Sequence, residues 1–411
     1  MGKFLLLALR NVFRNRRRTT MTLAMVGGGV TGLLLVGGFF AFMFHGLRES
    51  TINNGLGHLQ IFNAEHFERD EVRVLDTGIA NWRQVAASVS TGGHVRGVAP
   101  RIEFYGMVSN GQKSSVFMGS AVDPAAEKSL GFNPHLKAGR DLDGAEGREI
   151  EALVGEGLAK SMNVKAGDGL TLMSVTADGA LNGIDVEVAG IVYTGIKDID
   201  DRYIRITLDS AQRLLQSERV TNLVVSLDKT ENTDAAAALL GPKLGGGGGG
   251  QRLTLKKWID LAAYYKQVHS LFSAIFIFLG VIVFFMVVMS SVNTLLMAMM
   301  ERTREIGTML AMGTPRSWVM SLFVTEALLL GAMGAVVGLI AGNALGALLN
   351  ASGLHMAPPP GDTFPLPFRV LHEPGLMIGS SLLVIVSLAL ASILPALRAS
   401  RLRIAEALAH V

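Results

Sequence analysis

Residues 271–289 have the sequence LFSAIFIFLGVIVFFMVVM, nineteen residues without one charged side chain. A helix of about 20 apolar residues spans the roughly 30 Å hydrocarbon core of a bilayer. With its flanking residues, this stretch predicts a transmembrane helix over 269–298. Three further apolar stretches lie at 21–45, 318–350 and 376–397. The sequence therefore predicts a membrane protein with four transmembrane helices.

The composition agrees with a chain that lipid partly solvates. Of 411 residues, 49% are apolar and 17% are charged, whereas soluble domains contain about 25% charged residues. The net charge of +3 is spread without the continuous basic face that nucleic acids require, so we expect no nucleic-acid partner. Because cysteine is absent, disulfides, thiolate nucleophiles and cysteine-bound metals are excluded.

The basic residues beside the four apolar stretches predict the topology. Such residues lie in 1–20, 299–317 and 398–411, namely Lys3, Arg10, Arg14, Arg16, Arg17, Arg18, Arg302, Arg304, Arg316, Arg398, Arg401 and Arg403, whereas 351–375 contains only Arg369. Since cytoplasmic loops carry the excess of lysine and arginine, both termini and 299–317 are expected in the cytoplasm, and 46–268 outside it. The first apolar stretch is longer than the roughly 7–15 residues of a signal-peptide core, so we expect an uncleaved anchor.

Residues 1–20 have a helical pattern of their own. At 100° per residue, one arc is apolar and the opposite arc is basic, formed respectively by Leu5, Leu6, Leu9, Val12 and Phe13, and by Lys3, Arg10, Arg14, Arg17 and Arg18. This predicts an amphipathic helix on the inner leaflet. The alternative is a plain basic anchor without a helix.

The segment 46–268 has the pattern of a mixed α/β domain. Residues 186–193, 202–208 and 223–227 are typical of strands. A short helix is expected at 211–216 with Asp209 as its N-cap, and Gly167–Gly169 predicts a turn.

The same segment contains no pattern typical of an enzyme. The glycine run 245–250 is not followed by Gly-Lys-Ser/Thr, so it predicts a flexible loop and not a phosphate cradle. Glu65, His66 and Glu68 are expected in a solvated loop, because no histidine spacing typical of a metal site accompanies them. We therefore predict a non-catalytic chain with no resident cofactor or metal.

Two motifs beside the apolar stretches resemble a known family. Glu301-Arg-Thr-Arg-Glu-Ile-Gly-Thr-Met-Leu-Ala-Met-Gly313 resembles the cytoplasmic loop of the FtsX-like permeases, the MacB/LolC/LolE class of ABC transporter subunits. Residues 395–408 resemble the C-terminal signature of that family. In 46–268, the segments 154–160, 164–168 and 188–192 are similar to the MacB-type periplasmic core domain, while 57–61 and 118–124 are most similar to LolC and LolE.

The 299–317 connection is predicted to contain a short helix. The pairs Glu301–Arg304 and Arg302–Glu305 have the i,i+3 spacing that supports a helix, and Gly313 followed by Pro315 ends it. The resemblance implies a coupling helix that docks to an ATPase; a solvated connector is the alternative. The residues to which it assigns this role are Glu301, Arg302, Thr303, Arg304, Glu305, Ile306, Gly307, Met309, Leu310, Met312 and Gly313.

The third span carries a row of small residues and one acid. Gly334, Gly338, Gly342 and Gly346 recur every four residues and predict close packing on a neighbouring span. Glu326 lies about 12 Å into the span, where an ionisable group normally faces the bundle interior or water. We expect packing or transmission from it; a proton relay is the alternative. The prolines of 358–367 predict a stiff outer loop.

The resemblance implies mechanotransmission in the bacterial inner membrane. Two permeases, identical or paralogous, pair above two copies of an ATPase that binds ATP and Mg²⁺, and they extract lipoproteins for a periplasmic carrier. Phe39, Phe40, Met43 and Phe44 are candidates for lining the substrate cavity, with lipid-facing or packing roles as the alternative. A MacB-like efflux permease, an FtsX-like regulator of a cell-wall hydrolase and a sensor without transport remain rival functions. The first is disfavoured because MacB carries its ATPase on the same chain and this sequence contains no ATP-binding motif.

Overall fold

The computed structural model describes residues 2–68, 75–132, 134–143, 150–195, 197–245, 251–356 and 366–401. The chain forms two compact units. The helical unit contains Met1–Gly46, Val268–Met356 and Pro365–Val411, and the α/β unit contains Leu47–Gln267 and Ala357–Phe364. The glycines 246–250, the prolines of 358–365 and the end of the C-terminal motif, 402–408, lie outside the described residues.

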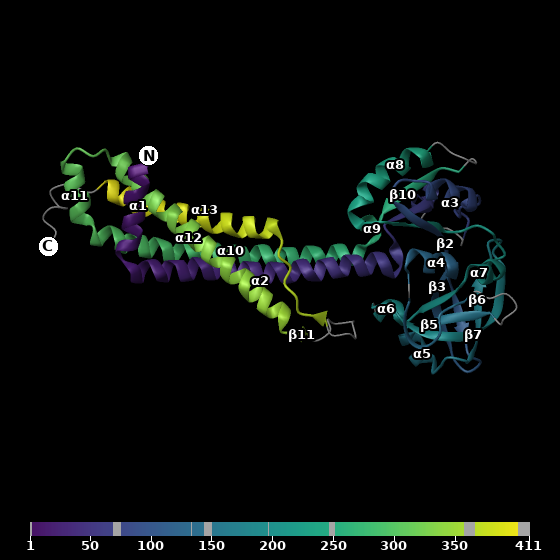
Figure 1. The fold of residues 1–411 in the computed structure, drawn as a ribbon. Coiled ribbons are helices and arrows are strands. Elements are labelled where there is room, and N and C mark those ends of the chain that lie inside the picture. Colours follow the sequence, from purple (N-terminus) through teal and green to yellow (C-terminus); the bar gives the residue numbers. More distant parts are fainter. Residues whose placement is uncertain are drawn as a thin grey trace. The chain divides into compact units, whose positions relative to one another are not determined.

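Long helices dominate the helical unit (Figure 1). Its elements, two of which continue into the α/β unit, are α1 (Gly2–Arg14), α2 (Arg16–Thr51), α10 (Ala263–Glu301), α11 (Thr303–Ala311), α12 (Arg316–Ala351), α13 (Pro374–Ser400) and a small ladder of β11 (His355–Met356) with β12 (Leu366–Pro367). Among the described residues, α2, α10, α12 and α13 are long and apolar enough to cross a membrane, which confirms the four predicted spans. Each extends beyond its apolar stretch, because helical hydrogen bonding does not depend on side-chain polarity.

The glycine row of α12 lies against α2. A Cβ atom added to Gly338 would come within 2.6 Å of Val30 Cβ and 2.7 Å of the Gly27 carbonyl oxygen, and Thr31 Oγ1 donates to the Gly338 carbonyl at 3.2 Å. Gly334 and Gly342 have equally close neighbours on α2, in Val26 and Leu34. Such small residues let two helix backbones approach closely. Gly346 lies beside Val370 and His372 instead.

The helix α10 has the least protein cover of the four spans. Only 6% of its most apolar 18-residue window is buried, against 44% for α2 and for α12. Its contacts with α2 include Val283 beside Gly29 and Phe276 beside Gly37. The rest of its apolar surface is therefore left for lipid or for another membrane helix.

The α/β unit is built on one mixed sheet. Within the described residues, ten strands run in the order β10-β1-β9-β2-β3-β8-β5-β7-β4, with β6 paired to β2 and β7. The pairs β3–β8 and β5–β7 are parallel and the others are antiparallel. The strands are β1 (Leu59–Asn63), β2 (Val95–Ser109), β3 (Ser114–Val122), β4 (His135–Gly139), β5 (Glu151–Gly155), β6 (Gly169–Val175), β7 (Leu181–Tyr193), β8 (Tyr203–Thr207), β9 (Asn222–Leu227) and β10 (Leu253–Lys257).

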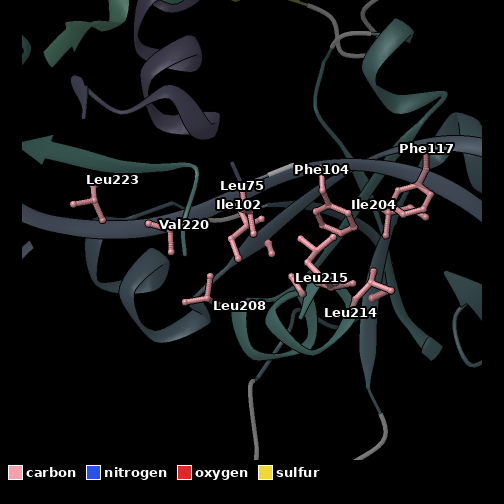
Figure 2. Close-up of a cluster of buried hydrophobic side chains, with 14 of the residues drawn as sticks. Leu75, Ile102, Phe104, Phe117, Ile204, Leu208, Leu214, Leu215, Val220 and Leu223 are labelled. Atoms are coloured by element: carbon pink, nitrogen blue, oxygen red, sulfur yellow. The ribbon is translucent and has the colours of Figure 1, made fainter. Parts of the chain in front are cut away.

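Short helices join these strands and complete the unit. They are η1 (Ile52–Leu56), η2 (Ala64–Phe67), α3 (Trp82–Ser90), α4 (Pro124–Leu130), α5 (Glu156–Met162), α6 (Lys197–Asp200), α7 (Leu208–Leu215), η3 (Thr230–Asn232), α8 (Thr233–Gly245) and α9 (Trp258–Leu261). Figure 2 shows part of the core, where Leu214 and Leu215 of α7 lie with Phe104 and Ile204 of the sheet. Burial of such large apolar side chains is the main stabilising contribution to this unit.

The predicted strands 186–193, 202–208 and 223–227 correspond to β7, β8 and β9. The predicted N-cap was wrong. The hydroxyl of Thr207, not the carboxylate of Asp209, accepts from the Ser210 amide, because α7 already begins at Leu208. Glu65 and His66 lie in η2, where His66 stacks on Phe62 with ring centres 5.1 Å apart.

Two buried contacts hold the chain where it enters and leaves the α/β unit. Ile52 of η1 packs with Trp258 and Ala262, just ahead of α10. Arg101 of β2 donates to both carboxylate oxygens of Glu127, at 2.7 and 2.8 Å, and to the carbonyl oxygen of Gly55. Gly55 has φ +148°, a conformation that favours glycine.

Candidate functional site

The motif 301–313 forms a short helix between two long ones. Arg302 has φ −113° and ψ 13°, which separates α10 from α11. Gly313 has φ +89° and is followed by Pro315, the residue before α12. The predicted helix and its stop are confirmed, although α11 occupies only Thr303–Ala311.

The helix α11 has one buried and one exposed face. Of the proposed coupling residues, the buried ones are Arg302, Thr303, Ile306, Gly307 and Leu310. Ile306 and Leu310 pack with Met299, Val319, Phe323, Ala396 and Ala399. The exposed residues are Glu301, Arg304, Glu305, Met312 and Gly313, with Met312 78% exposed and Met309 half-buried. The proposed coupling residues therefore divide into those that hold α11 to the bundle and those that are available to a partner.

The centre of the buried face is an ion pair between Arg302 and Glu326 of α12. Arg302 Nη1 lies 3.0 Å from Glu326 Oε1 and 3.3 Å from Oε2. The two residues are 6% and 5% exposed. Removing one member of such a pair leaves the other charge buried without its counter-ion, at a cost that depends on the hydrogen bonds that remain. Glu326 thus faces the bundle interior, the arrangement expected for an acid inside a span.

The N-terminal helix α1 contacts both α12 and α11. Asn11 Nδ2 of α1 donates to Glu326 Oε1 at 2.6 Å, and Arg14 Nη1 lies 2.7 Å from Glu305 Oε1. Within the described part of the chain the predicted pair Glu301–Arg304 does not form. Glu301 is the last residue of α10 and binds Arg18 Nη1 at 3.1 Å instead.

The second predicted pair is present. Arg302 Nε lies 3.2 Å from Glu305 Oε2. Desolvation disfavours the ionised Glu305, but hydrogen bonds from Arg14 and Arg302 outweigh it and lower the pKa of this carboxyl. Glu305 therefore carries a negative charge between two guanidinium groups.

The position of Val12 differs from the sequence prediction. It was expected on the lipid-facing arc of α1, but it is 3% exposed and packs with Val26, Leu330 and Leu388. The reason is that α1 lies on α12, so that its Ala8–Val12 side is covered. Leu6, Leu9 and Phe13 remain exposed, as an interfacial helix requires.

A cavity of about 20 Å³ lies beside Glu326. Thr22, Ser291 and Thr294 contribute hydroxyl groups to its wall. The Ser291 hydroxyl is buried and has no hydrogen-bond partner among the described residues. Such a space has room for one water molecule, the ordinary partner of a buried hydroxyl.

The candidate cavity residues of the first span lie in an aromatic cluster. Phe40 contacts Phe272 of α10 with ring centres 5.2 Å apart, and Phe44 contacts His269 at 4.5 Å. Phe39 stacks on Phe368 at 4.7 Å. All three, and Met43, are half-buried. The aromatic partners of these residues belong to the same helical unit. In this conformation the phenylalanines therefore pack between helices of the bundle.

Sequence reasoning missed the roles of Asn11, Arg14 and Arg18. One signal was present: Asn11 shares a helical face with Ala8 and Val12, and a polar residue on a buried face needs a partner. A similar signal marks Arg302, which has i,i+4 spacing to Ile306 on the apolar face of α11. The identity of the partners had no local signal, because 315 residues separate Asn11 from Glu326.

Comparison with known families agrees with this architecture. Residues 19–242 match the MacB-like periplasmic core domain, which is more than half of the 411-residue chain, and residues 271–404 match the FtsX-like permease C-terminal family. The chain therefore belongs to the FtsX-like, MacB-type family of ABC transporter permeases. The four spans and the α/β unit are the fold of this class, as the motifs predicted.

The individual relatives include both lipoprotein-releasing and export proteins. The lipoprotein-releasing system transmembrane protein LolE of Haemophilus influenzae is 24% identical over 64% of this chain and 64% of its own length. LolC of Neisseria meningitidis is 23% identical over 82% of this chain and 80% of its own length. The macrolide export ATP-binding/permease protein MacB of Hyphomonas neptunium is 26% identical over 56% of this chain and 34% of its own length. The chain thus spans slightly under two thirds of LolE and one third of MacB.

Proposed function

We propose that this chain is the membrane subunit of an ATP-driven complex that releases lipoproteins from the outer leaflet of the bacterial inner membrane to a periplasmic carrier. The observation that carries the proposal is the match to LolC, a lipoprotein-releasing subunit, which extends over about four fifths of both chains. In this proposal both termini are cytoplasmic and the α/β unit is periplasmic. The distribution of lysine and arginine beside the spans supports that orientation.

The energy source is a separate ATPase, present in two copies, that binds ATP and Mg²⁺. The given sequence contains no ATP-binding motif. The exposed side of α11, with Arg304 and the 78% exposed Met312, is the surface proposed to contact it. A short helix with one face packed in the bundle and one face free is suited to pass a push from a partner to the spans.

Lipoprotein release requires work of the order that ATP supplies. An acyl chain gains about 0.8 kcal/mol for each CH₂ buried in a bilayer. A second permease, identical or paralogous, would complete the path for these chains. The aromatic cluster of Phe40 and Phe44 with α10 is the proposed lining, because it is apolar, half-buried and next to the least covered span.

A second function, export of a peptide or drug, is favoured by the MacB match. Depletion of the chain in its native host, followed by fractionation of palmitate-labelled lipoproteins, separates the two. Retention of lipoproteins in the inner membrane is the expected result. An unchanged lipoprotein distribution would reject the first function, and loss of drug resistance alone would support the second. Copurification of a cell-wall hydrolase would point instead to an FtsX-like regulator.

A further inference from the structure

Three polar contacts join the N-terminal segment to the region around α11. They are Asn11 to Glu326, Arg14 to Glu305 and Arg18 to Glu301, with donor–acceptor distances of 2.6, 2.7 and 3.1 Å. An aromatic contact adds to them, since the rings of Phe4 and Trp318 meet edge to face at 5.3 Å. Arg18 lies at the start of α2, and the other three contacts come from α1. Three contacts from α1 across 291 to 315 residues of sequence are more than an interfacial helix needs to lie on a membrane.

The three polar contacts differ in burial. Arg14 and Glu305 are about half exposed, as is Glu301, so these pairs orient the helices and are weakened by salt. The contact of Asn11 reaches a carboxylate that is 5% exposed. A hydrogen bond to a buried charge is both stronger and more directional than a surface ion pair.

Glu326 Oε1 accepts from two donors at once, one on α1 and one at the N-cap of α11. Asn11 Nδ2 and Arg302 Nη1 both donate to this oxygen, at 2.6 and 3.0 Å. Asn11 of α1 thus helps to fix the Glu326 carboxylate, and this carboxylate in turn fixes Arg302 at the start of α11. Arg302 in turn contacts Glu305, which also binds α1. With Arg14, the residue of α1 that binds Glu305, these five residues form a closed loop of contacts through α1, α11 and α12.

We propose that α1 is a positioning element of the coupling apparatus: through Asn11 and Glu326 it sets the position of Arg302 and so the orientation in which α11 meets the ATPase. The part of this inference that concerns the ATPase rests on the proposed function. The positioning of α11 by α1 does not. Asn11, Glu326 and Arg302 are positioning residues, because none of them belongs to the exposed surface that is proposed to contact the ATPase. A push on α11 would then move α1 and α12 with it.

The absence of cysteine allows a direct test in the full-length chain. Spin labels on Leu6→Cys and Met312→Cys, both at exposed positions, report the distance between α1 and α11 in nanodiscs. We expect one narrow distance distribution, and a clear broadening in Asn11→Ala. Asn293→Ala is the matched control, because Asn293 is exposed on α10 and its side chain forms no hydrogen bond with the described residues; it should leave the distribution unchanged.

Charge exchange separates positioning from simple loss of stability. Arg302→Glu alone places three acids together, because position 302 contacts both Glu305 and Glu326, and it should broaden the distribution. Adding Glu326→Arg restores an ion pair, and Glu305→Gln removes the acid that would otherwise repel the new carboxylate at position 302. The Asn11 amide, which has both a donor and an acceptor, still bonds to the exchanged pair; the narrow distribution should return. If the distance distributions between α1 and α11 were equal in Asn11→Ala, in Arg302→Glu and in the chain with neither substitution, the inference would be overturned.

Titration of the chain with the ATPase that copurifies with it gives the second measurement. The affinity should fall about tenfold in Asn11→Ala, the order of one hydrogen bond to a charged group, and recover in the charge-exchanged variant where Asn11 is kept. An unchanged affinity beside a broadened distribution would reject the link to the ATPase. If the unaltered chain binds no ATPase, the proposed function fails, while the distances still decide whether α1 positions α11.

Discussion

Each unit of the chain contains a buried arginine–glutamate pair, but the two pairs are built differently. In the α/β unit, Arg101 meets Glu127 with two parallel hydrogen bonds of 2.7 and 2.8 Å, and its remaining nitrogen reaches a backbone carbonyl. In the helical unit, one nitrogen of Arg302 contacts both oxygens of Glu326 at 3.0 and 3.3 Å. All four side chains are at most 7% exposed. Similar burial therefore accompanies two distinct geometries.

The difference indicates two roles. A bidentate arginine–carboxylate pair fixes both distance and angle, so Arg101 holds η1 rigidly against β2 and α4. Arg302 and Glu326 each divide their hydrogen bonds among several partners, Glu305 and Asn11 included. The first pair is a fixed attachment, while the second is a branch point at which three helices meet. Our proposal that α11 contacts an ATPase assigns the coupling role to the second kind of pair.

The largest predicted effect belongs to the fixed pair. Glu127→Ala leaves Arg101 buried without a counter-ion and should lower the free energy of unfolding of the α/β unit by about 3–5 kcal/mol. The three tryptophans divide between the units, with Trp82 and Trp258 in the α/β unit and Trp318 in the helical unit. Denaturant unfolding followed in variants that keep only Trp258, or only Trp318, measures each unit separately. In Arg101→Met/Glu127→Leu, where no charge is stranded, the loss should be smaller.

The branch point should be less sensitive to the loss of one partner. In Arg302→Ala, Glu326 keeps its hydrogen bond from Asn11, so we expect a loss of about 2–3 kcal/mol in the unfolding signal of Trp318. The double variant Asn11→Ala/Arg302→Ala removes both donors and should lose more than the sum of the single variants. A loss in Arg302→Ala as large as that in Glu127→Ala would remove the distinction between the two pairs.

Packing between α2 and α12 also stabilises the helical unit. Gly338→Ala puts a Cβ atom 2.7 Å from the Gly27 carbonyl oxygen, so the helices must separate, at about 1–3 kcal/mol. Gly28→Ala is the matched control, since its added Cβ atom meets no atom within 4 Å. The prediction is tested by the Trp318 unfolding midpoint, which should fall only in Gly338→Ala. A fall in both variants would mean that helix backbone effects, and not the α2–α12 contact, are responsible.

The smallest effect is expected at the exposed edge of the network. Arg14→Ala should change stability by no more than about 1 kcal/mol, because both partners are about half exposed. The lowered pKa of Glu305 determines how the stability depends on pH. The stabilisation by the Arg14–Glu305 pair is present above the ordinary carboxyl pKa of about 4.3. It is lost as the pH falls through the lower pKa of the folded state. Arg14→Ala should therefore weaken this acid dependence, whereas Arg10→Ala, at an exposed position without an ion pair among the described residues, should not. Unfolding series between pH 3 and 6 provide the measurement, and equal pH profiles for the two variants would contradict it.

Much of the layout was predictable, because its causes are local. An apolar stretch such as 271–289 spans a membrane whatever its neighbours are, since lipid requires apolar side chains over that length. The stop of α11 was equally local, because Gly313 has a positive φ. Glu326 could be singled out as an acid in a span, but its partners could not. The motif places Arg302 among the expected ATPase-coupling residues together with Glu301 and Arg304, since charge alone does not show burial.

The sequence by itself therefore determined the number of spans, the inserted α/β unit, the short helix of the 299–317 connection and the family. These depend on composition and spacing, which act over a few turns of the chain. Only the tertiary structure decided that Arg302 points inward, that Val12 is buried, and that Asn11 and Arg302 share one carboxylate oxygen. The physical reason is that these contacts form between residues 24 to 315 positions apart, and no local pattern specifies which distant surfaces will pack together.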